Sequence, residues 1–255
     1  MMRFASLGSG SQGNALVVEA GRTRVLLDCG LGLNDVRTRL ARCGLEAGDL
    51  DAIVVTHEHD DHVGGVARLA RKFEIPVYMT YGTLTALDGA RAVIAQITVI
   101  DSHTPFAIGD IEVRPYPVPH DAREPAQFVF NDGRASLGVL TDAGSSTPHI
   151  ESMLSGLDAL VLECNHDRDL LANGSYPPYL KQRIGGRFGH LDNASAAGLL
   201  GHLDCSRLKH VIAAHLSQQN NTPELARAAM AQALSCEPGW IGVADQQSGF
   251  AWRDI

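Results

Sequence analysis

Thr-His-Glu-His-Asp-Asp-His, residues 56–62, places four potential metal ligands within six positions. The stretch follows an apolar, β-branched run, Ile53–Val55, and precedes a segment of helical periodicity that we expect to begin near Val63. A buried strand that ends in a loop rich in imidazole and carboxylate brings several donors to one point, as a metal site requires. We therefore interpret it as half of a two-metal site, whose other half must come from elsewhere in the chain.

The composition is that of a globular protein. The chain has 255 residues, of which 45% are hydrophobic and 20% are charged, and it contains no internal repeat, low-complexity tract or linker. We predict one domain over residues 1–255. The formal net charge of -8 argues against broad, nonspecific binding to nucleic acid or anionic membrane, although it leaves room for a local basic cleft.

Cysteine usage and hydropathy predict a cytoplasmic location without membrane association. The five cysteines are odd in number, scattered and free of CxxC pairs, which is typical of a reducing compartment. No apolar run approaches the roughly 20 residues that a membrane span needs. Met1–Phe4 leads directly into a strand pattern, without the apolar segment and cleavage site of a signal peptide.

Strand and helix patterns alternate in the first and last thirds of the chain, which predicts an α/β fold. Strand patterns cover residues 2–8, 14–20, 24–30, 53–55, 76–79, 159–162 and 210–214. Helical patterns cover residues 34–43, 63–73, 192–202 and 223–234. Residues 97–141 are β-rich, and we expect them to form antiparallel hairpins.

Gly8–Gly13 satisfies the dinucleotide-binding pattern GxGxxG. That fingerprint requires a helix to start at this point, so that the helix amino terminus can receive a pyrophosphate. Ala15–Glu19 instead continues as a strand pattern. We therefore predict a tight turn between two strands, which could still face an active site.

Further donors follow the ends of other predicted strands. His120, Asp142 and His215 each come directly after an apolar run, and loops at the ends of strands are where α/β architectures place their sites. Asp28 also ends a strand. It is either a turn or capping carboxylate or a group that accepts the second N–H of a ligand histidine. The remaining histidines without neighbouring donors are expected to be structural: His103, His149, His202 and His210.

Together these residues resemble the successive motifs of the metallo-β-lactamase superfamily, over nearly the whole chain. The flanking segments 6–14, 162–167, 189–191 and 214–217 are similar, more narrowly, to the bacterial WalJ/YycJ-like branch. The resemblance implies an αββα sandwich, with two mixed sheets flanked by helices and a dinuclear site between them. It implies His57, His59 and His120 as ligands of one metal, Asp61, His62 and His215 as ligands of the other, and Asp142 as the bridge.

The donor set itself limits the metal. Imidazole and carboxylate without thiolate suit zinc, manganese or iron. We expect two divalent ions, zinc or manganese ahead of iron, because His59 stands where oxygen-reducing di-iron members of the superfamily carry a glutamate. Two metals a few Å apart can lower the pKa of a bridging water, polarise the scissile group and stabilise the leaving oxygen. Glu58 and Asp60 are expected to point away from the metals.

His190 and Glu163 bear on the type of hydrolysis. Phosphodiesterase branches of the superfamily carry a carboxylate and a histidine at matching points, where the acid orients the imidazole and the imidazole protonates the leaving group. The alternative is a capping histidine and an ordinary strand-end glutamate. We favour catalytic roles for both residues, and we count the ligand Asp61 with them.

A basic segment lies between these two residues. Lys181, Arg183 and Arg187 are the best candidates for contact with a phosphate backbone, although a solvated helix face explains them nearly as well. Only 47 residues separate Asp142 from His190, which leaves no room for the large cap of β-CASP members, so we expect an open site.

These features predict a dinuclear metal-dependent hydrolase. The WalJ/YycJ-like branch implies a DNA exonuclease, in which the water that bridges the metals attacks the phosphodiester and nucleic acid is the partner. The alternatives are hydrolysis of a small ester, thioester or cyclic phosphodiester and, from another class, a metal-stabilised binding protein without catalysis. Dimers are common in the superfamily, but the sequence identifies no interface and leaves the oligomeric state open.

Overall fold

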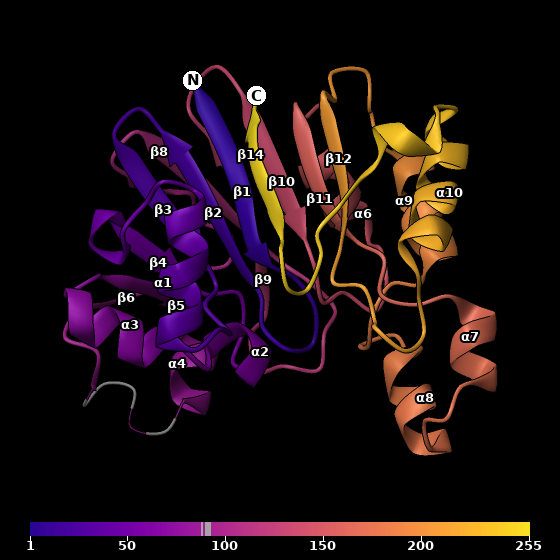
Figure 1. Cartoon of the computed structure of the whole chain (residues 1–255), viewed down its shortest axis with the longest axis horizontal. Helices are drawn as coiled ribbons and strands as arrows, with labels where there is room; N and C mark the ends of the chain where they lie inside the picture. The colour runs from indigo at the N-terminus through magenta and orange to yellow at the C-terminus, as the bar shows by residue number, and fades with distance from the viewer. Residues whose placement is uncertain (88, 90–92) are drawn as a thin grey trace.

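Two β-sheets packed face to face form the centre of the molecule (Figure 1). The structure, a computed structural model, describes residues 1–87, 89 and 93–255. Within these residues each sheet has seven strands, and helices lie on the outer face of each sheet. The predicted αββα arrangement of two mixed sheets flanked by helices is therefore confirmed. No helix in the described ranges is long and apolar enough to cross a membrane.

The first sheet is built from the N-terminal part of the chain and its last strand. Across the sheet the order is β14 (Phe250–Asp254), β1 (Met2–Gly8), β2 (Ala15–Ala20), β3 (Thr23–Leu27), β4 (Ala52–Val54), β5 (Val77–Thr80) and β6 (Ile97–Ile100). Pairing is antiparallel from β14 to β3 and parallel from β3 to β6. The helices on its outer face are α1 (Leu33–Arg42), α3 (Val66–Phe73) and α4 (Tyr81–Ala86).

The second sheet contains the middle and late strands. Their order is β13 (Gly242–Val243), β12 (His210–Ala214), β11 (Ala159–Glu163), β10 (Ser136–Leu140), β9 (Ala126–Asn131), β8 (Ile111–Pro117) and β7 (Phe106–Ile108). The helices on its outer face are α6 (Pro148–Leu154), α9 (Asn193–His202) and α10 (Pro223–Leu234). Two short helices, α7 (Arg168–Asn173) and α8 (Pro178–Ile184), lie beyond the end of the sheet (Figure 1).

Two predictions about local structure were wrong. The helix predicted over residues 63–73 is present from Val66 to Phe73 as α3, but it does not begin at Val63, which is the last residue of the separate helix α2 (Asp60–Val63). The break between the two helices brings Gly65 so close to Leu31 that a Cβ atom would clash with the Leu31 carbonyl oxygen. Residues 97–100 do not form an antiparallel hairpin. They are β6, which pairs in parallel with β5 at the edge of the first sheet.

The predicted turn at Gly8–Gly13 is confirmed, since β1 and β2 pair as antiparallel neighbours on either side of it. This excludes the dinucleotide-binding arrangement, which needs a helix at that point.

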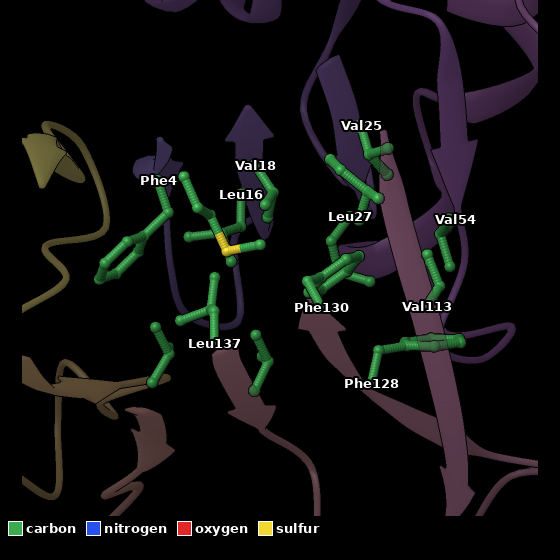
Figure 2. Packing of buried hydrophobic residues seen from close by; sticks show 14 of the residues in the cluster. Phe4, Leu16, Val18, Val25, Leu27, Val54, Val113, Phe128, Phe130 and Leu137 are labelled. Atoms are coloured by element: carbon green, nitrogen blue, oxygen red, sulfur yellow. The ribbon is translucent and has the colours of Figure 1, made fainter. Parts of the chain in front are cut away.

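The core between the sheets is apolar on both sides. Phe128 and Phe130 of β9 point across the interface toward Leu27 and Val54 of the first sheet (Figure 2). Alternate residues of the same strands face outward and pack against the helices, as Leu26 of β3 does. Because each sheet is buried on both faces, its strands are held rigidly, and the loops at their ends are positioned with them.

Candidate metal centre

The predicted ligands, and Asp28 as the predicted orienting carboxylate, come from loops at one end of the sandwich. Asp28 follows β3 and His57 follows β4 in the first sheet, while Asp142 and His215 follow β10 and β12 in the second. All four of these side chains are buried. The two sheets thus present their strand ends to a common point, as the sequence pattern predicts.

Three of these loops have an unusual backbone. Asp28, Asp142 and His215 have φ values of 59°, 54° and 55°, in the left-handed region. The other non-glycine residues with positive φ in the described ranges, Glu74 and Ser235, cap the carboxyl ends of helices. For a non-glycine residue the left-handed conformation costs about 1–2 kcal/mol. Such strain gathers at functional sites, where the side chain must point in one direction.

Three imidazoles form the first ligand group. Nδ1 of His59 lies 3.0 Å from Nε2 of His57 and 3.3 Å from Nε2 of His120. One ring nitrogen can donate or accept only one hydrogen bond, so His59 cannot satisfy both neighbours. Ligands about 2.0–2.1 Å from a tetrahedral ion lie roughly 3.3 Å apart, which is close to the spacing found here. The three nitrogens therefore suit a shared divalent cation.

Asp61, His62 and His215 form the second group. Oδ2 of Asp61 lies 3.3 Å from Nε2 of His215 and 3.5 Å from Nε2 of His62. The loop Gly8–Asn14 reaches the same group, because the Asn14 amide lies 3.1 Å from Nε2 of His62 and 3.3 Å from Oδ2 of Asp61.

Asp142 lies between the two groups. Its Oδ2 is 3.1 Å from Nε2 of His62, and its Oδ1 is 3.7 Å from Nε2 of His215 and 3.9 Å from Nε2 of His120. Oδ2 is buried and has no hydrogen-bond partner among the described residues. A buried carboxylate oxygen without a donor is costly, and a cation would satisfy it. The residues present therefore fit a metal site.

Three of the candidate ligand rings, those of His57, His62 and His120, have an oxygen partner on the side away from the ligand groups. Nδ1 of His62 donates to Oδ2 of Asp28 at 2.7 Å, and Nδ1 of His120 donates to the Gly189 carbonyl at 3.0 Å. Nδ1 of His57 lies 2.9 Å from Oγ1 of Thr56, whose own hydroxyl donates to Asp28. Such partners fix the tautomer and leave Nε2 unprotonated toward the metal. Asp28 thus lies where the sequence analysis places an orienting carboxylate.

Glu163 holds two histidines with one oxygen. Its Oε1 lies 2.8 Å from Nδ1 of His190 and 3.3 Å from Nδ1 of His215, while Oε2 accepts the N–H groups of Ala143 and Leu191. The pairing of Glu163 with His190 agrees with the sequence analysis. The link from Glu163 to His215, a predicted ligand, was not predicted. Because Glu163 and Nδ1 of His190 are engaged with one another, Nε2 is the His190 nitrogen left for a substrate.

The electrostatics keep the carboxylates ionised. Burial alone would raise the pKa of Asp142, but His215 and His62 hold it well below its usual range. Burial opposes the charge on His215, yet Asp142 and other carboxylates raise its pKa to about 10. Burial and the neighbouring His62 hold the pKa of His57 well below its ordinary value. Ionised carboxylates and a neutral His57 are the forms that bind cations.

A cleft of about 310 Å³ opens over these groups. Its lining includes four predicted ligands, together with His190 and Arg183: His59, Asp61, Asp142 and His215. Arg183 pairs with Asp121 at 2.6 Å. Lys181 donates to the Ala172 carbonyl and does not line the cleft, and the exposed Arg187 does not line it either. Of the three predicted phosphate contacts, the structure brings Arg183 alone into the cleft.

The residues that flank the motif have separate environments. Glu58 accepts the N–H of Arg123, and Asp60 is exposed at the edge of the cleft. Neither belongs to a ligand group among the described residues. The four histidines expected to be structural are likewise outside these groups: His103, His149, His202 and His210.

The Gly8–Asn14 loop, which was predicted as a turn that could still face an active site, contacts the candidate ligands. Ser9 accepts the backbone N–H of His215 at 2.9 Å. Gln246, near the C-terminus, accepts the N–H of Gln12 and donates to the Gly13 carbonyl, both at 2.9 Å. These contacts join residues more than 200 positions apart, so no local pattern could reveal them.

Comparison with known proteins places these features in a family. A family model described as the Beta-lactamase superfamily domain matches residues 23–215. Exodeoxyribonuclease YycJ of Bacillus anthracis is 35% identical over 245 residues, which cover 95% of this chain and 93% of that protein. Exodeoxyribonuclease WalJ of Streptococcus pneumoniae is 33% identical, with 94% and 91% covered. The resemblance inferred from the sequence motifs is confirmed.

Solved structures agree on the fold. The metallo-β-lactamase fold protein YhfI from Bacillus subtilis matches with a TM-score of 0.78 and covers 100% of both chains, at 17% sequence identity.

Gly30 sets the position of the metal loop, and its substitution should reduce metal binding. A Cβ atom at Gly30 would overlap the backbone carbonyl of Asp61. We expect Gly30→Ala to displace Asp61, to lower the metal content of the purified protein and to cost about 1–3 kcal/mol of stability. Metal analysis after dialysis and thermal denaturation measure the two effects.

The matched control is Gly198→Ala in α9, where the new Cβ would meet no described atom within 4 Å apart from its chain neighbours and the backbone of its own helix. This variant should keep its metal and be as stable as the unaltered chain or about 0.5–1 kcal/mol more stable, because alanine favours a helix interior. Full metal content in Gly30→Ala would contradict the prediction.

Proposed function

Since the chain belongs to the beta-lactamase superfamily, we propose that it is a dinuclear metal-dependent hydrolase that cleaves phosphodiester bonds at the end of a DNA strand. The observation that carries this proposal is the Glu163–His190 pair beside the ligand groups. An alkoxide leaving group needs a proton, and His190 is placed to supply one. The two relatives compared above, which are named exodeoxyribonucleases and match almost the whole chain, support DNA as the substrate.

We assign the metal ligands as the sequence motifs imply. His57, His59 and His120 would hold one ion, Asp61, His62 and His215 the other, and Asp142 would join them. Four carboxylates, those of Asp28, Asp61, Asp142 and Glu163, converge on this region, and two divalent ions would balance their charge. Zinc or manganese suits these donors. When bound, the ions supply Lewis-acid activation of water and of the phosphate.

His190 acts as the acid in this proposal. The Glu163 carboxylate fixes Nδ1–H of His190, so Nε2 carries the proton that passes to the leaving oxygen. Asp61 contributes as a ligand at the edge of the cleft. Glu163 is a positioning residue, because it orients both His190 and the ligand His215.

Arg183 binds a phosphate of the strand. Arg183 lines the cleft, and its guanidinium pairs with Asp121. A phosphate of the substrate can replace Asp121 as the partner of this guanidinium. Lys181 and Arg187 do not line the cleft, and Lys181 joins α8 to α7 by donating to the Ala172 carbonyl.

The substrate class can be tested with four compounds. The metal-loaded protein should hydrolyse bis(p-nitrophenyl) phosphate and end-labelled single-stranded DNA, and it should leave S-lactoylglutathione and nitrocefin intact. Zinc and manganese are compared in parallel with metal analysis. Turnover of the thioester or the lactam without any phosphodiester turnover would replace this proposal with hydrolysis of a small ester or thioester.

The acid role of His190 predicts an effect that depends on the leaving group. His190→Ala should lower turnover of a DNA oligonucleotide by about 10²–10⁴-fold, because the alkoxide then leaves unprotonated. It should affect bis(p-nitrophenyl) phosphate much less, since p-nitrophenolate leaves without an acid. His103→Ala, at an exposed histidine, is the control and should match the unaltered chain. Loss of metal from His190→Ala would make His190 a ligand, and an equal loss on both substrates would also contradict the acid role.

The phosphate contact predicts a change in salt dependence. Arg183→Ala should weaken binding of a single-stranded phosphorothioate oligonucleotide and lower the slope of log K against log salt by about 0.7, as removal of one phosphate contact does. Lys181→Ala changes the same charge on the same helix and should have a smaller effect. Fluorescence anisotropy over a range of salt concentrations measures both variants. An unchanged slope in Arg183→Ala would exclude the contact.

A further inference from the structure

Residues 174–190, which we call the arm, extend from the metal centre beyond the sheets. They contain α8 and the loop that leads to His190 (Figure 1). The base of the arm is fixed to the site. The Phe188 carbonyl accepts the N–H of Asp121 at 3.0 Å, and the Gly189 carbonyl accepts Nδ1–H of the ligand His120. None of the seven described residues of α8 is buried. The helix is therefore held in place without contributing to the core.

The arm exposes large aromatic side chains. Tyr179 is 73% exposed and Phe188 is 59% exposed, both far above what a residue retained for packing shows. Tyr179 precedes Arg183 by four positions, so the two side chains lie on the same face of α8, about one helical turn apart. Arg183 lines the cleft. Tyr179 therefore lies on the same face of α8 as Arg183, one turn farther from the cleft.

The charge of the arm is opposite to that of the whole chain. Residues 174–190 contain three basic residues and no acidic residue, whereas the chain carries a formal charge of -8. Cations interleaved with exposed aromatic rings are the surface that binds single-stranded nucleic acid, in which phosphates meet the cations and unpaired bases stack on the rings.

The cleft is too small to hold more than a short part of a DNA strand. About 310 Å³ is at the lower end of the range for small-ligand sites, so the cleft accommodates roughly one nucleotide. The following nucleotides must then lie outside it. The arm supplies four of the residues that line the cleft: Arg183, Ile184, Gly189 and His190.

From these observations we infer that the arm is a binding site for single-stranded DNA, in which Tyr179 and Phe188 stack on the unpaired bases that follow the nucleotide in the cleft. The inference rests on the proposed function for the identity of the strand. It adds a substrate preference, since a base in a duplex cannot offer its face to either ring.

The test measures binding and chemistry separately. The metal-loaded protein is titrated into a fluorescein-labelled phosphorothioate oligodeoxythymidylate, and turnover of bis(p-nitrophenyl) phosphate is measured on the same samples. Tyr179→Ala and Phe188→Ala should each raise the Kd for the oligonucleotide about 5- to 100-fold, as loss of one base–aromatic stack does. Turnover of the small diester should stay within about twofold, because neither ring belongs to the metal centre.

Three control variants make the test specific. Tyr179→Phe and Phe188→Tyr keep an aromatic ring and should bind as the unaltered chain does. Trp240→Ala removes a ring that is 43% exposed beside α10, outside the arm, and should leave the Kd unchanged. Exposed residues contribute little to stability, so all variants should keep the thermal midpoint of the unaltered chain.

The inference is overturned if the oligonucleotide does not bind, if both alanine variants bind it normally, or if Trp240→Ala weakens binding equally. Equal weakening in Tyr179→Phe and Phe188→Tyr, or equal weakening toward a blunt duplex of the same length, also excludes stacking. If any of these results is found together with normal diester turnover, the inference about the arm is rejected and the proposed hydrolase function is retained. Weakened binding in the alanine variants of a protein without phosphodiester turnover would support the arm and reject the hydrolase.

Discussion

The convergence of imidazole and carboxylate donors at one end of the sandwich is the constraint on which the rest of the structure depends. Each ligand group lies within 4.8 Å and includes buried side chains, which lose their hydration there. Asp28, Asp142 and His215 also hold left-handed backbone conformations. These costs are sustained because both sheets are buried on both faces, so that the strands before each loop have little freedom to relax.

The sequence could predict that these donor residues converge, because strand ends and donor residues coincide in it. Apolar runs such as Ile53–Val55 locate a strand, and the polar residue that follows is then placed at the edge of a sheet. Partners are harder to predict. Asp28 was expected to orient some histidine, but only the pairing of β3 with β4 in the first sheet shows that it is His62. The second contact of Glu163, with His215, depends on the parallel register of β11 and β12 and has no local signal.

The local predictions that were wrong also failed because of contacts between residues distant in the sequence. The helix expected over residues 63–73 begins only at Val66 because Gly65 must approach Leu31, a contact that the helical periodicity does not record. Residues 97–100 have the pattern of a short strand. The sequence of this segment does not specify that it pairs with β5. A solvated helix face was one interpretation of the basic segment in α8, but the bounds of this helix were not predicted, because none of its residues is buried and no buried apolar face marks it. The features that could not be predicted from the sequence are those set by nonlocal contacts. The residues of the candidate site could be predicted because their side chains are of the types that bind metals.

The Gln246 contact ties the metal centre to the end of the chain. Gln246 holds the Gly8–Asn14 loop, and β14 then pairs with β1, so the first and last strands lie side by side (Figure 1). Synthesis on the ribosome proceeds from the N-terminus, and the loop that supports Asp61 and His215 therefore waits for a partner made some 230 residues later. All of the candidate metal ligands are translated before Gln246 is. A nascent chain thus contains the donor residues before the Gln246 contacts can hold the loop beside them. The complete geometry forms only after residue 246 has been translated.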